Sequence, residues 1–411
     1  MSTIVRRRSP LPFLRARAVL LAVLLSALSA VWVAAPAAAL DPPAGNAFYV
    51  PPDPLPPGRP GDVIWHRVAS TSIARDNNAT AYEVLYRSTG VDGRANAVSG
   101  TVLVPNAAWG GGGTRPLTAY ATGTQGWDDS CAPSYSMRAG LFDEAFAVTN
   151  LLRRGWAVAV TDYPGLGTPG DHQYNVGISE GRAVMDVLRA ATRLAPARID
   201  PATTIGIEGY SQGGGAAGWV AQSAPSYAPE LRIAGIAAGG IPANLQAVKE
   251  NIDDSLFFAF LAGTAIGFRA AYPAIDVDRY LTPYGRSEIA RLNGMCQIPA
   301  LIAFANKEIR DYTIGGMDPT VQPDFRAALD ANNLGGTRPS APMLVYHGWL
   351  DEVIPWGQVA QRVHGQWCAL GGNMKLKGYI AEHVSTQIIS QNDTVNWLAD
   401  RIAGRPQTSD C

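Results

Sequence analysis

Short apolar runs alternate with longer helical runs along most of the chain. The strand-like runs cover residues 82–86, 97–104, 116–121, 156–161, 204–208, 233–238, 342–346 and 374–379. The runs with helical spacing cover residues 180–194, 214–222, 357–370 and 386–402. The first of these is the clearest, with apolar side chains that include Val184, Leu188 and Ala191. This alternation predicts an α/β fold with a central, mainly parallel sheet.

One long segment, residues 243–338, interrupts the alternation because it holds little strand-like sequence. Within it, residues 255–261 are apolar on every face, so a helix there has to be buried or has to cover an apolar surface. We therefore expect a mostly helical lid, inserted between two core parts at residues 40–242 and 339–411; an ordinary helical subdomain is the alternative. The lid side chains expected beside a substrate are Leu256, Phe257, Phe258, Phe260 and Leu261.

Residues 1–39 have the order of a secretory signal peptide. An arginine-rich start precedes an apolar run over residues 18–35, and Ala37-Ala38-Ala39 offers a cleavage site built of small residues. A membrane anchor is the alternative, since the apolar run is nearly long enough to span a bilayer. No basic stop-transfer cluster follows the run, so the sequence predicts secretion with cleavage near Ala39.

The net charge argues against nucleic-acid binding, and the cysteines indicate disulfides. Residues 1–39 hold five of the 33 basic residues and none of the 34 acidic ones, so the rest of the chain carries a net charge of −6. A mildly acidic chain without a basic stripe is a poor nucleic-acid binder. An even number of cysteines in an exported chain indicates disulfides, here with three possible pairings and no zinc-like spacing. The four cysteines are Cys131, Cys296, Cys368 and Cys411.

Two Gly-x-Ser-x-Gly sequences occur, at residues 177–181 and 209–213. In a nucleophile elbow, a buried strand precedes the serine and a helix follows it. Ser211 has both flanks, because a strand-like run ends just before it and small residues that can open a helix follow. Ser179 follows a polar loop and is expected to cap a helix. We therefore expect an α/β-hydrolase fold with Ser211 as the nucleophile.

A serine needs a base to take its proton, usually a histidine oriented by a carboxylate. In this fold the chain order is serine, acid, histidine. Of the histidines after Ser211, His347 ends a strand before any suitable acid, and His364 lies within a helical run. His383 follows the last expected strand, where the triad histidine belongs.

The acid should follow the preceding strand, where Asp351 and Glu352 both fit. The loop pattern His-Gly-x-x-Asp-x-x-x-Pro favours Asp351 and leaves Glu352 as a solvated neighbour. The tetrahedral oxyanion needs backbone N–H donors. One comes from the residue after the nucleophile, Gln212, and the Gly-rich loop at residues 123–126 is the best source of the other.

Several segments, in the same order along the chain, resemble those of the secretory lipase family. They are residues 48–52, 129–135, 207–211, 226–231 and 380–383. The second contains the sequence Cys-Ala-Pro-Ser, and the third ends with Glu-Gly-Tyr-Ser at the elbow. The likeness extends over nearly all of residues 40–411.

The resemblance implies a triad of Ser211, Asp351 and His383, and places the second oxyanion donor at Gln125. The family's type enzyme has an acidic residue at that position, so only a backbone role carries over. The resemblance also implies the disulfides Cys131–Cys296 and Cys368–Cys411, and a helical lid before the strand that leads to Asp351. It further implies hydrolysis of carboxylic esters, including long-chain triacylglycerols, without a cofactor or metal.

The sequence therefore predicts a secreted carboxylic ester hydrolase, with a triacylglycerol lipase as its most specific form. Its partners would be a lipid or other ester substrate and, transiently, a lipid interface. An acyltransferase or a short-chain esterase could use the same triad, because the relative access of water and alcohol decides between them. The third alternative is a non-catalytic surface binding protein. A complete triad argues against it, because a protein that only binds does not need one.

Overall fold

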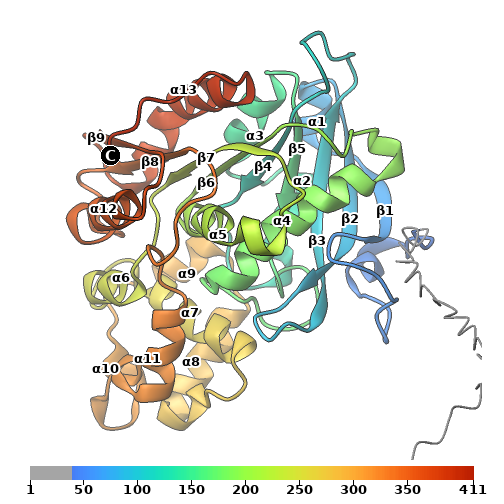
Figure 1. The fold of residues 1–411 in the computed structure, drawn as a ribbon. Helices are drawn as coiled ribbons and strands as arrows, with labels where there is room; N and C mark the ends of the chain where they lie inside the picture. The colour runs from blue at the N-terminus through green and yellow to red at the C-terminus, as the bar shows by residue number, and fades with distance from the viewer. Residues whose placement is uncertain (1–38) are drawn as a thin grey trace, which may run out of the picture. The chain divides into compact units, whose positions relative to one another are not determined.

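A nine-stranded sheet lies at the centre of the computed structural model, which describes residues 39–411 (Figure 1). The strands are β1 (Val63–Ala69), β2 (Ala79–Thr89), β3 (Ala95–Pro105), β4 (Leu117–Ala121), β5 (Ala157–Thr161), β6 (Ile205–Tyr210), β7 (Ile233–Gly239), β8 (Met343–Gly348) and β9 (Met374–Tyr379). Their order in the sheet is β1-β2-β3-β5-β4-β6-β7-β8-β9. The pairs among β1, β2, β3 and β5 are antiparallel, and all pairs from β5 to β9 are parallel. The expected α/β fold with a mainly parallel sheet is confirmed.

Helices lie in most of the connections between strands and after the last strand. They are α1 (Ser72–Asp76), α2 (Pro133–Ala139), α3 (Ala145–Leu152), α4 (Gly177–Arg193), α5 (Gln212–Tyr227), α6 (Leu245–Ile252), α7 (Phe258–Ala271), α8 (Pro283–Asn293), α9 (Gln297–Ala303), α10 (Ile309–Tyr312), α11 (Pro323–Ala331), α12 (Arg362–Ala369) and α13 (His383–Ile402). A π-helical turn, Trp356–Gln361, precedes α12, so the single helix expected over residues 357–370 is in two parts.

The parallel strands are buried on both faces, which explains their continuous apolar sequences. Along β5, Ala157 and Ala159 pack in one core with residues of α4 and α5. Val158 and Val160 point to the opposite face and pack with residues of α3 and α13. Alternate side chains of one strand thus fill two cores, as the two-residue period of a strand requires.

The edge strand β1 is absent from the strands expected from the sequence. Its pairing with β2 shifts register between Val63 and Trp65. Such an irregularity disturbs the alternation of buried and exposed side chains, and Ile64 and Trp65 are both buried while Val68 is exposed. The sequence of β1 therefore has no regular apolar period.

Residues 243–338 form the helices α6 to α11, and none of the strands that the structure describes falls among them. Pairing of β type within this segment is limited to isolated bridges such as Leu281 with Thr313. In the view of Figure 1 these helices gather below α5. The segment joins β7 to β8, where the sequence predicts a helical insertion.

The signal peptide expected over residues 1–39 lies, except for Ala39, outside the residues that the structure describes. Between residues 39 and 411, no helix has both the length and the hydropathy needed to cross a membrane.

Candidate active site

Ser211 occupies the sharp turn between β6 and α5. Its backbone has φ 58° and ψ −123°, a strained conformation for a residue with a Cβ atom. A Cβ atom on Gly209 would lie 2.2 Å from the carbonyl oxygen of Gly213, and a Cβ atom on Gly213 would lie 1.9 Å from that of Ala121. The two glycines of the pentapeptide are therefore required for strand and helix to approach this closely.

The imidazole of His383 joins Ser211 to Asp351. Its Nε2 atom lies 3.0 Å from Oγ of Ser211, and its Nδ1 atom lies 2.7 Å from Oδ2 of Asp351. Asp351 follows β8 and His383 begins α13 directly after β9, so neighbouring strands carry the two residues. Because Nδ1–H donates to the carboxylate, Nε2 can accept the proton of the Ser211 hydroxyl. The structure thus brings all three expected residues together.

Asp351 is held as a carboxylate although it is buried. Its Oδ1 atom accepts the backbone N–H groups of Val353 and Ile354, at 3.0 and 2.7 Å. Burial alone would raise the pKa of Asp351, but the imidazoles of His383 and His347 outweigh it and hold that pKa well below its usual range. An ionised Asp351 can stabilise the imidazolium that forms when His383 takes a proton.

Glu352, the other carboxyl considered for the acid, contacts the backbone of the same histidine. It is exposed, as expected, but its Oε2 atom accepts the backbone N–H of His383 at 3.0 Å. Glu352 therefore helps to fix the start of α13, and the imidazole of His383 faces Asp351.

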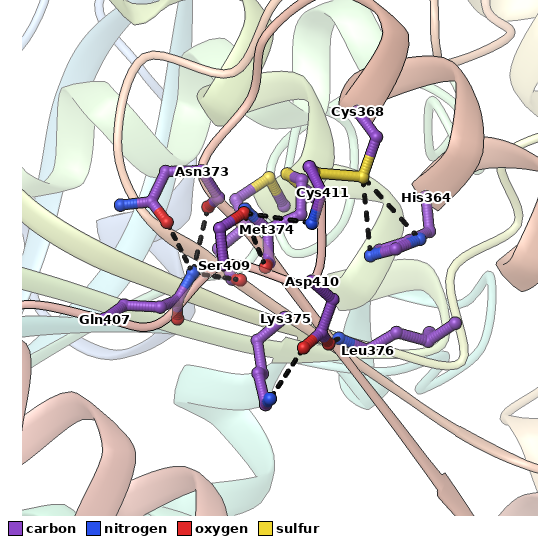
Figure 2. The surroundings of a disulfide bond; sticks show 11 residues. His364, Cys368, Asn373, Met374, Lys375, Leu376, Gln407, Ser409, Asp410 and Cys411 are labelled. Atoms are coloured by element: carbon purple, nitrogen blue, oxygen red, sulfur yellow. Dashed lines mark hydrogen bonds and ion pairs between the residues drawn. A yellow bond between two sulfur atoms is a disulfide. The ribbon is translucent and has the colours of Figure 1, made fainter.

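His364 lies beside the second disulfide (Figure 2). Its ring nitrogens are 3.7 and 3.9 Å from the Sγ atom of Cys368, which is bonded to Cys411. These three residues place potential metal ligands within 4.8 Å of one another. Since both sulfurs are joined in a disulfide, neither is a thiolate that could bind a metal.

Ser179 is the third residue of α4, and the helix cap expected there is wrong. The N-cap residue is Val176, because the helix begins two residues before Ser179. Ser179 is fully buried, and its hydroxyl donates to the carbonyl of Val176 at 3.0 Å. This internal hydrogen bond gives the second Gly-x-Ser-x-Gly sequence a structural explanation.

The two expected oxyanion donors lie at the first turn of α5 and in the loop after β4. Gln212 is the first residue of α5, where backbone N–H groups have no partner within the helix. Gln125 lies in the loop after β4, and its carbonyl accepts the N–H of Gln297 at 2.9 Å. The disulfide Cys131–Cys296 lies next to this contact, with a Cα–Cα distance of 5.5 Å. Both disulfides join the cysteines that the resemblance pairs.

A largely apolar cavity begins at Ser211 and Gln212 and is lined mainly by lid residues. Of the five lid side chains expected beside a substrate, Phe258, Phe260 and Leu261 line it. Leu256 and Phe257 are not among the lining residues, and Leu256 is 57% exposed. The helix α7 begins only at Phe258, so these two residues lie outside the helical face that meets the cavity.

A buried polar network beside Gln212 is absent from the sequence expectations. The Nε2 atom of Gln212 donates to Oε1 of Glu180 at 2.7 Å and to Nε2 of His172 at 3.0 Å. Burial raises the pKa of Glu180 to about 8 and lowers that of His172 to about 4. A signal was available in the sequence: Glu180 lies four residues before Val184, on the apolar face of its helix.

Comparisons with known proteins identify relatives of this chain. A sequence model of the family described as secretory lipase matches residues 140–410. A secreted triacylglycerol lipase of Malassezia globosa is 29% identical over 384 residues, which span 89% of this chain and 82% of that relative. A Mycobacterium tuberculosis protein described as a probable inactive lipase is 28% identical over 383 residues, with 89% of this chain and 84% of that relative covered.

Among solved structures, lipase A of Candida antarctica has the same fold. The TM-score is 0.81 at 24% identity, over 89% of this chain and 87% of that chain. Together with the family match over residues 140–410, the elbow and the fold lead to one assignment. The chain belongs to the secretory lipase family.

Proposed function

We propose that this protein is a secreted carboxylic ester hydrolase that acts on triacylglycerols through a triad of Ser211, His383 and Asp351. The observation that carries the proposal is the unbroken hydrogen-bonded series from Asp351 through His383 to Ser211, the last of which lines an apolar cavity. A nucleophile, a base and an orienting carboxylate at such distances are what acyl transfer requires.

In the acylation step, Oγ of Ser211 attacks the ester carbonyl carbon while Nε2 of His383 takes the hydroxyl proton. The negative charge that develops on the carbonyl oxygen is stabilised by the backbone N–H groups of Gln212 and Gln125. The tetrahedral intermediate collapses, and His383 gives its proton to the departing alcohol. The products of this step are the free alcohol and an acyl group bonded to Ser211.

In the deacylation step, a water molecule takes the place of the alcohol. His383 removes a proton from that water, which attacks the acyl carbon, and the same two N–H groups again stabilise the oxyanion. The intermediate releases the fatty acid and returns the proton to Ser211. Asp351 remains ionised throughout and stabilises the imidazolium in both steps.

In this proposal residues 40–242 and 339–411 form the catalytic core, and residues 243–338 form a lid that holds the acyl chain. The cavity beside Ser211 is lined by apolar side chains from lid helices, Phe260 and Leu261 among them. Each buried methylene of a chain contributes about 0.8 kcal/mol. Such a wall therefore favours long acyl chains over short ones.

A lipid surface is the partner that we propose for the rim of the site. Large apolar side chains next to the triad residues are more than half exposed: Leu350 precedes Asp351, and Val384 follows His383 in the first turn of α13. Ile380, just after β9, and Ile388, one turn after Val384 in α13, are also more than half exposed. Exposed apolar groups of this kind typically mark a protein or membrane contact.

The proposal is tested by labelling with a fluorophosphonate, followed by hydrolysis of p-nitrophenyl esters and triglycerides of increasing chain length. We expect covalent labelling at Ser211 and turnover that rises with chain length. Ser211→Ala should lose both, with kcat lower by roughly a million-fold. The matched variant Ser179→Ala should retain both. Absence of both labelling and turnover would favour the binding function, and faster transfer to an acceptor alcohol than to water would favour an acyltransferase.

A further inference from the structure

Two adjacent acids, Asp143 and Glu144, hold the loop that carries Gln125. The carboxyl group of Glu144 accepts the backbone N–H of Gly123, with distances of 3.0 and 3.2 Å to its two oxygens. Oδ1 of Asp143 accepts Nε2 of the Gln125 side chain at 3.2 Å. The acids precede α3, so a segment remote from the elbow fixes both ends of this short loop.

Glu144 also contacts the helix that begins with His383. Oε1 of Glu144 accepts Nε2 of Gln387 at 2.6 Å. Gln387 lies four residues after His383 and therefore on the same face of α13. The amide of Gln387 also donates to the hydroxyl of Tyr120 in β4, the strand that leads into the loop, at 3.1 Å. One carboxyl thus touches both the oxyanion loop and the histidine helix.

The packing around Glu144 is close. Glu144 is buried, and a Cβ atom on Gly123 would lie 2.8 Å from its Oε1 atom, so the loop passes directly over the carboxyl group. Burying a carboxyl group costs free energy that an apolar side chain would not. A purely apolar contact could fill the same space, but it could not hold a loop N–H and a helix side chain at one fixed separation.

We propose that Glu144 is a positioning residue, which sets the distance between the oxyanion donor at Gln125 and the base His383. The inference rests on the proposed function, in which both groups act on one tetrahedral intermediate. The negative charge is absent from the bound ester and develops on the way to the tetrahedral intermediate, so a displaced donor weakens the transition state and leaves substrate binding unchanged. A displacement of about 1 Å can cost roughly 100-fold in rate.

The loss variant is Glu144→Leu, which leaves the N–H of Gly123 and the amide of Gln387 without their acceptor. We expect kcat per labelled serine to fall by about 10- to 100-fold with KM unchanged. Affinity for an alkyl boronic acid, which forms a tetrahedral adduct with the serine, should fall by a similar factor. Glu144→Gln keeps a carbonyl for Gly123 and presents an amide N–H to a rotated Gln387 carbonyl, so it should restore most of kcat.

The control is Glu208→Leu. Glu208 is also a buried carboxyl that contacts α13, with hydrogen bonds from Gln391 at 2.7 Å and Thr394 at 3.2 Å. We expect Glu208→Leu to lower the melting temperature as much as Glu144→Leu does, but to leave kcat and boronate affinity near those of the native chain. This pair of variants distinguishes an effect of lower stability from an effect of displacing the donor at Gln125 relative to His383.

The inference is overturned if Glu144→Leu keeps native kcat and boronate affinity, or if both Leu variants lower kcat in proportion to their melting temperatures. It is also overturned if Glu144→Gln is as impaired as Glu144→Leu. These results differ from failure of the proposed function, in which the native chain itself would neither hydrolyse esters nor react with the fluorophosphonate.

Discussion

Nε2 of His347 lies 3.1 Å from Oδ2 of Asp351, the same oxygen that accepts the Nδ1–H of His383. Nε2 of His347 also lies 2.8 Å from the carbonyl oxygen of Ile354. A carbonyl can only accept, so this nitrogen carries the proton and is shared between the carbonyl and the carboxylate. His347, which is no member of the triad, thus donates to the triad acid from within β8.

We predict that His347→Phe lowers kcat by about tenfold, the equivalent of roughly 1.4 kcal/mol for a hydrogen bond to a charged group. The His347 N–H helps to keep the pKa of Asp351 low, so its loss lets the carboxylate take a proton more easily. The loss of activity on acidification should therefore begin at higher pH in the variant. A kcat–pH profile identical to that of the native chain would contradict this role.

The two acids of the loop after β8 should differ sharply on substitution. Asp351→Asn removes the charge that stabilises the imidazolium and should lower kcat by about 10,000-fold. Glu352→Gln keeps an acceptor for the backbone N–H of His383 and should remain active. Pre-steady-state acylation with a p-nitrophenyl ester measures both. An active Asp351→Asn beside an inactive Glu352→Gln would transfer the acid role to Glu352.

The acyl cavity gives a prediction with a neighbouring control. Phe260→Asp places a charge in the cavity wall and should lower activity on long-chain esters far more than on acetate esters, because buried methylenes lose their apolar contact. Leu256→Asp makes the same change at an exposed position outside the lining and should leave the long-to-short ratio unchanged. The ratio is measured together with the melting temperature of each variant. An equal ratio of long-chain to acetate activity in both variants would mean that the lid does not select the length of the acyl chain.

Stability should fall as the pH rises from about 5 to 8. Burial raises the pKa of Glu144 and Glu180 to about 8 and that of Glu208 to about 7. In this window the folded chain holds protons that the unfolded chain has released, so each group lowers the free energy of unfolding by up to about 1.4 kcal/mol per pH unit. Melting curves at several pH values test the slope, and Glu208→Gln should flatten it. A flat or rising profile in the native chain would contradict the prediction.

Much of the fold and of the triad geometry could be predicted from the sequence, because both depend on local order. The parallel strands are continuous apolar runs, and the elbow needs its two glycines, so Ser211 stands out from Ser179. The start of a helix is harder to predict. An apolar run does not show that α7 begins at Phe258, and the sequence therefore wrongly predicts Leu256 and Phe257 among the lining residues.

The buried acid Glu144 could not be predicted from the sequence, for a different reason. Glu144 and Gln387 are 243 residues apart in the chain, and neither belongs to a recognisable motif. The burial of Glu144 is explained only by partners that the tertiary fold supplies. The same holds for the edge strand β1, whose side chains follow its pairing with β2 and not a period of their own.

The disulfide between Cys131 and Cys296 has a mechanical consequence for any lid movement. Gly126 forms a β-bridge with Cys296, and the carbonyl of Gln125 accepts the N–H of Gln297. The start of α9 is therefore hydrogen-bonded to the oxyanion loop and covalently bonded to the segment that follows this loop. A displacement of α9 would therefore also displace the oxyanion loop and the backbone N–H donor of Gln125. Any lid movement that leaves the donor at Gln125 in place would therefore have to leave α9 fixed.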